Sequence, residues 1–155
     1  MAAITARQST MRRPRYPRIL GATAVAAVAS AGLNASLRYA AVAAFNIPQP
    51  QFEPLNLSPV VISSVAGAAA GGAFFALLAK LTRRPIRIFL PVAIAVLAMS
   101  MLPVLMVNLA DRPQYEGAGA AAGATLALMH LVVAAMLFGA LRWAHRLADD
   151  ERTSR

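Results

Sequence analysis

Four polar side chains lie at similar depth in four apolar stretches of this chain, and their types are among those most capable of chemistry there. Each comes from a different stretch: Asn34, Ser64, Ser100 and His130. A polar group in hydrocarbon is costly unless it finds a partner, so the four side chains should face inward and toward one another. At a rise of about 1.5 Å per residue, each lies about 18 to 24 Å along its helix from a flanking basic residue. The spacing therefore predicts one intramembrane polar layer.

His130 has two readings. In the functional one it titrates near neutral pH as a proton relay or sensor, or binds a metal or haem. In the structural one, which we favour, it is neutral and donates to Asn34 or Ser100, fixing helix register. His145 is the only other histidine, about 22 Å away along a helix. No Asp, Glu or Cys lies in any apolar stretch, so we predict no metal site, cofactor or catalytic residue.

The elements that must position these side chains are long apolar segments. We expect transmembrane helices at about 19–45, 59–81, 86–110 and 118–143, because each is near or above the roughly 20 residues that cross a bilayer. Charged residues make up 14% of the chain, against about 25% in soluble domains. The fold class is therefore an all-α integral membrane four-helix bundle spanning 18–145. A basic disordered tail (1–17) precedes it and a charged tail (146–155) follows it.

The positive charges predict orientation rather than nucleic-acid binding. The net charge is +9, but the basic residues sit at the ends of apolar stretches, where Lys and Arg mark cytoplasmic segments. The loop 46–57 carries Glu53 and no basic residue. Both termini are thus expected in the cytoplasm, in a bacterial plasma membrane. The link between the second and third helices is read as a topology signal that also contacts lipid headgroups, through Lys80, Arg83, Arg84 and Arg87.

Small residues spaced four apart predict close helix contacts. The second helix contains Gly67 and Gly71, and the fourth contains Gly119 and Gly123. Such pairs let helix backbones approach within a membrane. We favour contacts inside one chain; a homodimer through the glycine faces is the alternative.

The first loop and the entry to the second helix carry local signals. Pro48, Pro50 and Pro54 predict a stiff, extended loop, and Ser58 followed by Pro59 predicts a helix start with Ser58 as N-cap. Arg38 is expected at the outer interface, reaching headgroups or Glu53 in preference to a substrate anion.

Two questions of processing stay open from the sequence. Ala29-Ser30-Ala31 resembles a signal-peptide cleavage site, but the apolar run continues to Phe45, so we favour an uncleaved first helix. Met11 is an alternative start codon that would remove only part of the basic tail.

Several short motifs resemble a family of small four-span actinobacterial membrane proteins of unknown function. The resemblance covers about 18–145 and rests on Asn34, Ser100 with Pro103, Met129-His130 and the basic turn Arg83-Arg84-Pro85-Ile86-Arg87. It implies a four-helix bundle and carries no activity with it.

Together these observations predict a small, non-enzymatic membrane protein with an accessory or structural role, whose partners are the bilayer and another membrane protein or a second copy. The alternative is a minimal proton-coupled transporter working through His130 and Asn34. A membrane enzyme acting on lipid or quinone would need a convergent set of acid–base or metal-binding residues, and the sequence offers none.

Overall fold

The computed structural model describes residues 16–47, 52–82, 84–109 and 119–153. Four α-helices and one short 3-10 turn make up these ranges, which contain no strand. The elements in chain order are α1 (Tyr16–Phe45), η1 (Glu53–Leu55), α2 (Leu57–Leu81), α3 (Pro85–Leu109) and α4 (Ala120–Thr153). The structure therefore confirms the all-α prediction.

Each helix is long and apolar enough to cross a membrane. The qualifying segments hold 30, 25, 22 and 25 residues in chain order. At about 1.5 Å per residue, even 22 residues exceed the roughly 30 Å of bilayer hydrocarbon. By length and composition, the chain has the make-up of a multi-pass membrane protein.

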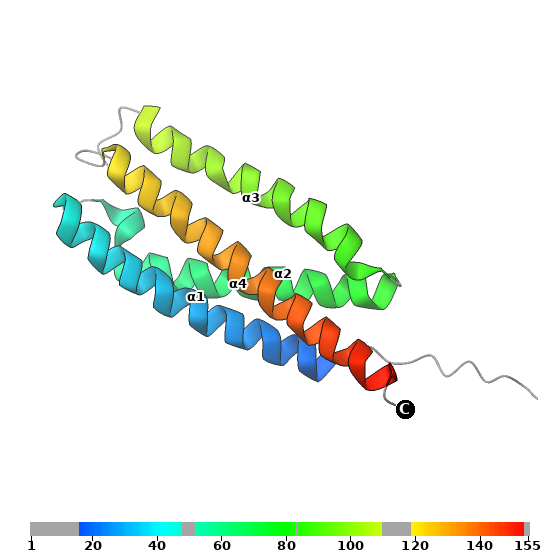
Figure 1. Ribbon diagram of the computed structural model, residues 1–155. Helices are drawn as coiled ribbons and strands as arrows, with labels where there is room; N and C mark the ends of the chain where they lie inside the picture. Colours follow the sequence, from blue (N-terminus) through cyan, green and yellow to red (C-terminus); the bar gives the residue numbers. More distant parts are fainter. Residues whose placement is uncertain (1–15, 48–51, 83, 110–118, 154–155) are drawn as a thin grey trace, which may run out of the picture.

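Successive helices run in opposite directions, so the molecule has two chemically different ends (Figure 1). The start of α1, the link between α2 and α3, and the end of α4 lie together. We call this the basic end, after its described cations Arg18, Lys80, Arg84, Arg87 and Arg142. The opposite end, where η1 lies, is called the capped end.

The helix bounds differ from the expected ones mainly at α4. This helix continues to Thr153, so most of the segment expected as a charged tail is helical. The residues after Trp143 are largely Ala, Leu, Arg, Asp and Glu without Gly or Pro, so nothing local stops the helix there. Of the expected tail 1–17, residues 16 and 17 begin α1, and residues 1–15 lie outside the described residues, as do the bounds expected at 110 and 118.

Close packing is greatest where α1 meets α2 and α4, while α3 lies on the outside against α4 and α2. The buried faces of α1 and α2 are lined by small or polar residues four positions apart. These residues are Ala22, Ala26, Ser30 and Asn34 on α1, and Val60, Ser64, Ala68 and Gly72 on α2. Small side chains allow close approach of backbones, which is the main source of helix association in lipid.

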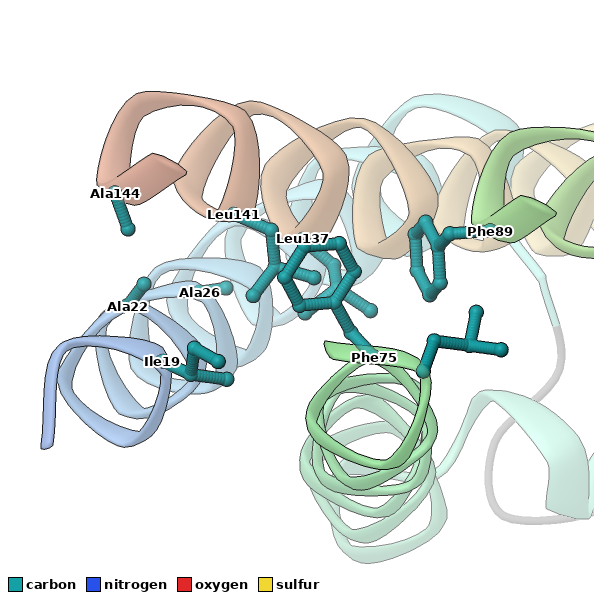
Figure 2. Close-up of a cluster of buried hydrophobic side chains, with 9 residues drawn as sticks. Ile19, Ala22, Ala26, Phe75, Phe89, Leu137, Leu141 and Ala144 are labelled. Carbon is teal, nitrogen blue, oxygen red and sulfur yellow. The ribbon is translucent and has the colours of Figure 1, made fainter. Parts of the chain in front are cut away.

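An apolar cluster fills the basic end, to which all four helices contribute (Figure 2). Phe75 of α2 meets Phe89 of α3 edge to face, with ring centroids 5.3 Å apart and planes at 90°. This is a favoured aromatic geometry. Leu137 and Leu141 of α4 and Ile19 of α1 complete the contact. Phe89 is thus one of the residues that tie the peripheral α3 into the bundle.

The capped end is closed by the first loop, and this corrects one prediction. Residues 53–55 form a 3-10 turn rather than extended chain, and Phe52 and Leu55 are completely buried. They pack in a second apolar cluster that also includes Ile47, Val60 and Met129. Extended chain would leave both side chains in solvent, so burial outweighs the stiffness that Pro54 imparts. Pro48 and Pro50 lie outside the described residues.

The start of α2 also differs from the prediction. The N-cap is Asn56, with extended ψ of 148°, and Ser58 already lies inside the helix. The Asn56 carbonyl accepts the first helical bond from the Val60 N–H, at 3.2 Å. Because the Asn56 N–H donates to Glu53 O at 2.9 Å, the turn fixes where the helix begins. Pro59 is tolerated because the first N–H groups of a helix have no acceptor within it.

Candidate intramembrane polar layer

Asn34 on α1 is the centre of the only side-chain network that joins three helices in the described part of the chain. Its side chain is 2% exposed. The Asn34 Nδ2 donates to Ser64 Oγ of α2 at 2.9 Å and to the Met129 carbonyl of α4 at 3.2 Å. Ser64 in turn donates to Val60 O at 2.7 Å. A helical carbonyl keeps a second lone pair, so Met129 can accept this extra bond.

The orientation of the Asn34 amide follows from its neighbours. The Met129 carbonyl is only an acceptor, so the amide nitrogen must face it. The opposite atom, Asn34 Oδ1, is buried and has no hydrogen-bond partner among the described residues. A buried acceptor without a donor costs about 1 to 3 kcal/mol. The Asn34 amide nitrogen is thus fully bonded, whereas the amide oxygen lacks a donor among the described residues.

Ser100 and His130 bond to their own helices. Ser100 Oγ donates to Leu97 O at 2.7 Å, and His130 Nδ1 lies 2.8 Å from Leu126 O. Because Leu126 O is an acceptor, Nδ1 is the donor in this bond and carries a proton. The expected bond from His130 to Asn34 or Ser100 is therefore replaced by one to Leu126. The residue that reaches Asn34 is its neighbour Met129, through the backbone.

Further hydroxyl groups of α1 and α4 follow the same local pattern. Ser30 Oγ donates to Ala26 O at 2.5 Å, Thr23 Oγ1 to Ile19 O at 2.8 Å and Thr125 Oγ1 to Ala121 O at 2.7 Å. Each hydroxyl thereby meets the hydrogen-bonding need that hydrocarbon leaves unfilled, without a partner helix. Among the four predicted layer residues, only Asn34 and Ser64 bond to each other.

The predicted glycine pairs differ in their contacts: the pair on α2 packs against α4, whereas Gly119 has no such contact. Built on Gly71 of α2, a Cβ atom would collide with Leu137 Cδ2 of α4, and on Gly67 it would lie 3.5 Å from Val133 Cγ1. This pair therefore serves a contact inside one chain. Gly119 lies before α4, exposed, with no atom within 4 Å of such a Cβ, because α4 begins only at Ala120. Gly123 is buried within α4.

Sequence reasoning missed the close contact between α1 and α2 at Gly72. There a Cβ would lie 2.8 Å from Thr23 Cβ of α1, and closer still to the other Thr23 side-chain atoms. Ser64, Ala68 and Gly72 follow one another at a spacing of four residues, and this pattern could have indicated the contact. It lies one position away from the predicted face of Gly67 and Gly71. Phe52 and Leu55 were missed too. Arg38 was expected to reach headgroups or Glu53, and in the structure its Nε donates to Leu55 O at 2.8 Å.

The basic residues between α2 and α3 lie at the rim of the bundle. Lys80, Arg84 and Arg87 are exposed, while Arg83 lies outside the described residues. Among the described side chains, no group of three or more His, Cys, Asp or Glu stands close enough together to hold a metal ion.

Comparison with known proteins places the chain in a family but not in a functional class. Neither a curated protein nor a solved structure matches it. Residues 9–147, which include all four helical spans and the polar layer, match a family described as "Family of unknown function (DUF6069)". Since this match covers most of the chain, the protein belongs to the DUF6069 family.

Proposed function

We propose that this protein is a small, non-enzymatic component of a bacterial cytoplasmic membrane, of actinobacterial type, with an accessory or structural role beside another membrane protein. The observation that carries the proposal is which partners the polar groups of the apolar helices bond to. Asn34 and Ser64 join α1, α2 and α4, while Ser100 and His130 bond to carbonyls of their own helices. Asn34 and Ser64 thus hold helices together, and Ser100 and His130 are bonded within their own helices instead of converging with them on a shared space for a substrate.

The distribution of charge supports an orientation with both termini in the cytoplasm. The cations of the basic end gather where α1 starts, where α2 meets α3 and where α4 ends (Figure 1). Basic residues near span ends are retained on the cytoplasmic side. Reporter fusions at Arg155 and within the loop 46–57 should therefore report opposite sides of the membrane. Reporters on the same side would refute this topology.

The accessory role is tested by affinity capture in a mild detergent followed by quantitative mass spectrometry. We expect one membrane protein to be recovered in an amount nearly equal to that of the captured protein. An unrelated four-span bait should not recover it. Gly72→Ala, which disturbs the contact between α1 and α2, should lose that partner, while Gly32→Ala should keep it because no atom lies within 4 Å of a Cβ at Gly32. Equal recovery from the unrelated bait would contradict the proposal.

A proton-coupled transporter is the second candidate, and one observation favours it. Asn34 Oδ1 is a buried acceptor without a donor among the described residues, and such an atom is suited to receive a hydrogen bond from a passing substrate. If the protein is a transporter, vesicles that contain it should show a proton-linked flux. Asn34→Ala and His130→Ala should abolish this flux, and the control Ser36→Ala should leave it intact. Ser36 is exposed and bonds only within α1. Absence of flux in the wild-type protein would eliminate this candidate.

A further inference from the structure

Three described cations flank the corner between α2 and α3: Lys80 at the end of α2, and Arg84 and Arg87 where α3 begins. The Thr82 N–H donates to Leu78 O at 2.8 Å, and the Arg84 N–H donates to Thr82 Oγ1 at 3.2 Å. The Arg87 N–H then donates to Arg84 O at 3.2 Å as α3 begins. These bonds fix the backbone that carries Lys80, Arg84 and Arg87, so the three charges share one rim of the bundle.

The charged groups at this corner are free to bind something outside the chain. Lys80, Arg84 and Arg87 are all exposed. Within the part of the chain that the structure describes, no ion pair or side-chain hydrogen bond engages their charged atoms. Like charges held together repel one another, and an anion between them removes that repulsion.

Apolar side chains stand directly beside these cations. Leu77 and Leu81 of α2 are 51% and 71% exposed, and Ile88 of α3 is 42% exposed. Beneath them, Phe89 of α3 packs against Phe75 of α2, which keeps the two helices together at this corner (Figure 2). The corner thus presents a positively charged edge next to an apolar surface, on a rigid support.

We propose that this corner binds an anionic phospholipid, with the headgroup phosphate on Lys80, Arg84 and Arg87 and the acyl chains along Leu77, Leu81 and Ile88. A free phosphate would use the charges and leave the apolar residues bare. An anionic lipid matches both parts, since basic residues attract anionic headgroups and exposed apolar residues cover acyl chains. The site goes beyond the proposed function, because it serves an accessory protein and a transporter equally.

The test uses the full-length protein in a nonionic detergent, titrated with phosphatidylglycerol or with phosphatidylcholine of the same acyl chains and followed by native mass spectrometry. We expect phosphatidylglycerol to bind at least about tenfold more tightly than phosphatidylcholine. The triple substitution Lys80→Gln, Arg84→Gln and Arg87→Gln should remove this preference. Arg142→Gln, an exposed cation on α4 at the same end, should leave it within about twofold.

Two further sets of variants separate a loss of charge from a loss of folding. The charge-conserving triple variant Lys80→Arg, Arg84→Lys and Arg87→Lys should retain the preference. If the glutamine variant fails to fold, Arg87→Gln alone should weaken binding severalfold. The proposal is overturned if the triple variant binds phosphatidylglycerol as the wild type does, or if inorganic phosphate displaces the lipid at equal concentration. Because detergent micelles have no inner and outer side, a change of orientation cannot mimic the loss.

Discussion

The two ends of the bundle are closed by different means. At the basic end, helix side chains form the apolar cluster, and Lys80, Arg84 and Arg87 beside the link between α2 and α3 are exposed. At the capped end, Phe52 and Leu55 of the link between α1 and α2 are part of the core. The Asn34 network lies between the two clusters. A connecting segment is thus a topology signal at one end and a packing element at the other.

The reason for the difference lies in the composition of the two links. The α2–α3 link carries Thr82 and a run of arginines, whose charges are best solvated at the rim. The α1–α2 link carries Phe52 and Leu55, which gain by leaving water. At its start, Asn46 adopts a positive φ of 49°, which ends α1 and turns the chain back toward the bundle. Asparagine tolerates this conformation better than most residues.

The largest effect is expected from breaking the capped end at Phe52. Phe52→Ala should lower the free energy of unfolding by about 3 to 5 kcal/mol, because it empties a fully buried site. Unfolding in mixed micelles of mild detergent and dodecyl sulfate measures the change. Phe45→Ala is the matched control, since Phe45 lies at the same end but is 60% exposed. Similar losses in the two variants would show that Phe52 does not anchor the cap.

The next largest effect is expected between α1 and α2 on the basic side of the polar layer. Gly72→Ala should cost about 1 to 3 kcal/mol, because its Cβ meets Thr23, whose Oγ1 is held by Ile19 O at 2.8 Å. Gly71→Ala should cost less, since only the end of Leu137 must move. Gly32→Ala should be neutral or slightly stabilising. The same micelle unfolding assay ranks the three, and an equal cost for all would contradict the close approach at Gly72.

A smaller effect is expected from substituting Arg38, which bonds to the 3-10 turn at the capped end. Arg38→Gln removes the bond from Arg38 Nε to Leu55 O, which should weaken the cap by about 1.5 kcal/mol. Hydrogen exchange should accelerate at the Leu55 and Asn56 amides, which bond to Phe52 O and Glu53 O. Arg142→Gln at the basic end should leave both amides unchanged. If Arg38→Gln leaves them equally protected, the cap is held by Phe52 and Leu55 alone.

The smallest expected effect concerns the layer that separates the ends. A double-mutant cycle with Asn34→Ala and Ser64→Ala should give a coupling energy of about 0.6 kcal/mol, the average for hydrogen bonds between membrane helices. A parallel cycle of Asn34→Ala with Ser36→Ala should give none, because Ser36 bonds to Gly32 O on the exposed face of α1. Equal coupling in both cycles would show that the effect is not specific to the Asn34–Ser64 bond.

Particular residues show how far the sequence predicts the candidate site. Asn34 and Ser64 are recognisable as polar residues at similar depth in apolar spans, and the structure shows the bond between them. His130 was recognisable in the same way, yet it takes an acceptor on its own helix. Depth along a helix follows from counting residues, whereas the direction of a side chain depends on how that helix is rotated in the bundle. Counting therefore finds the members of a layer but not its bonds.

What the sequence by itself determined is the number of spans, their approximate ends and the concentration of positive charge at the helix ends. These follow from length, hydropathy and charge, each of which is a sum over neighbouring residues. Only the tertiary structure decided that Gly72 packs against Thr23, that the Met129 carbonyl accepts a bond from Asn34, and that Phe52 and Leu55 close one end. Those choices depend on contacts between residues far apart in the chain, and no local period in the sequence specifies the rotation and register that bring such residues together.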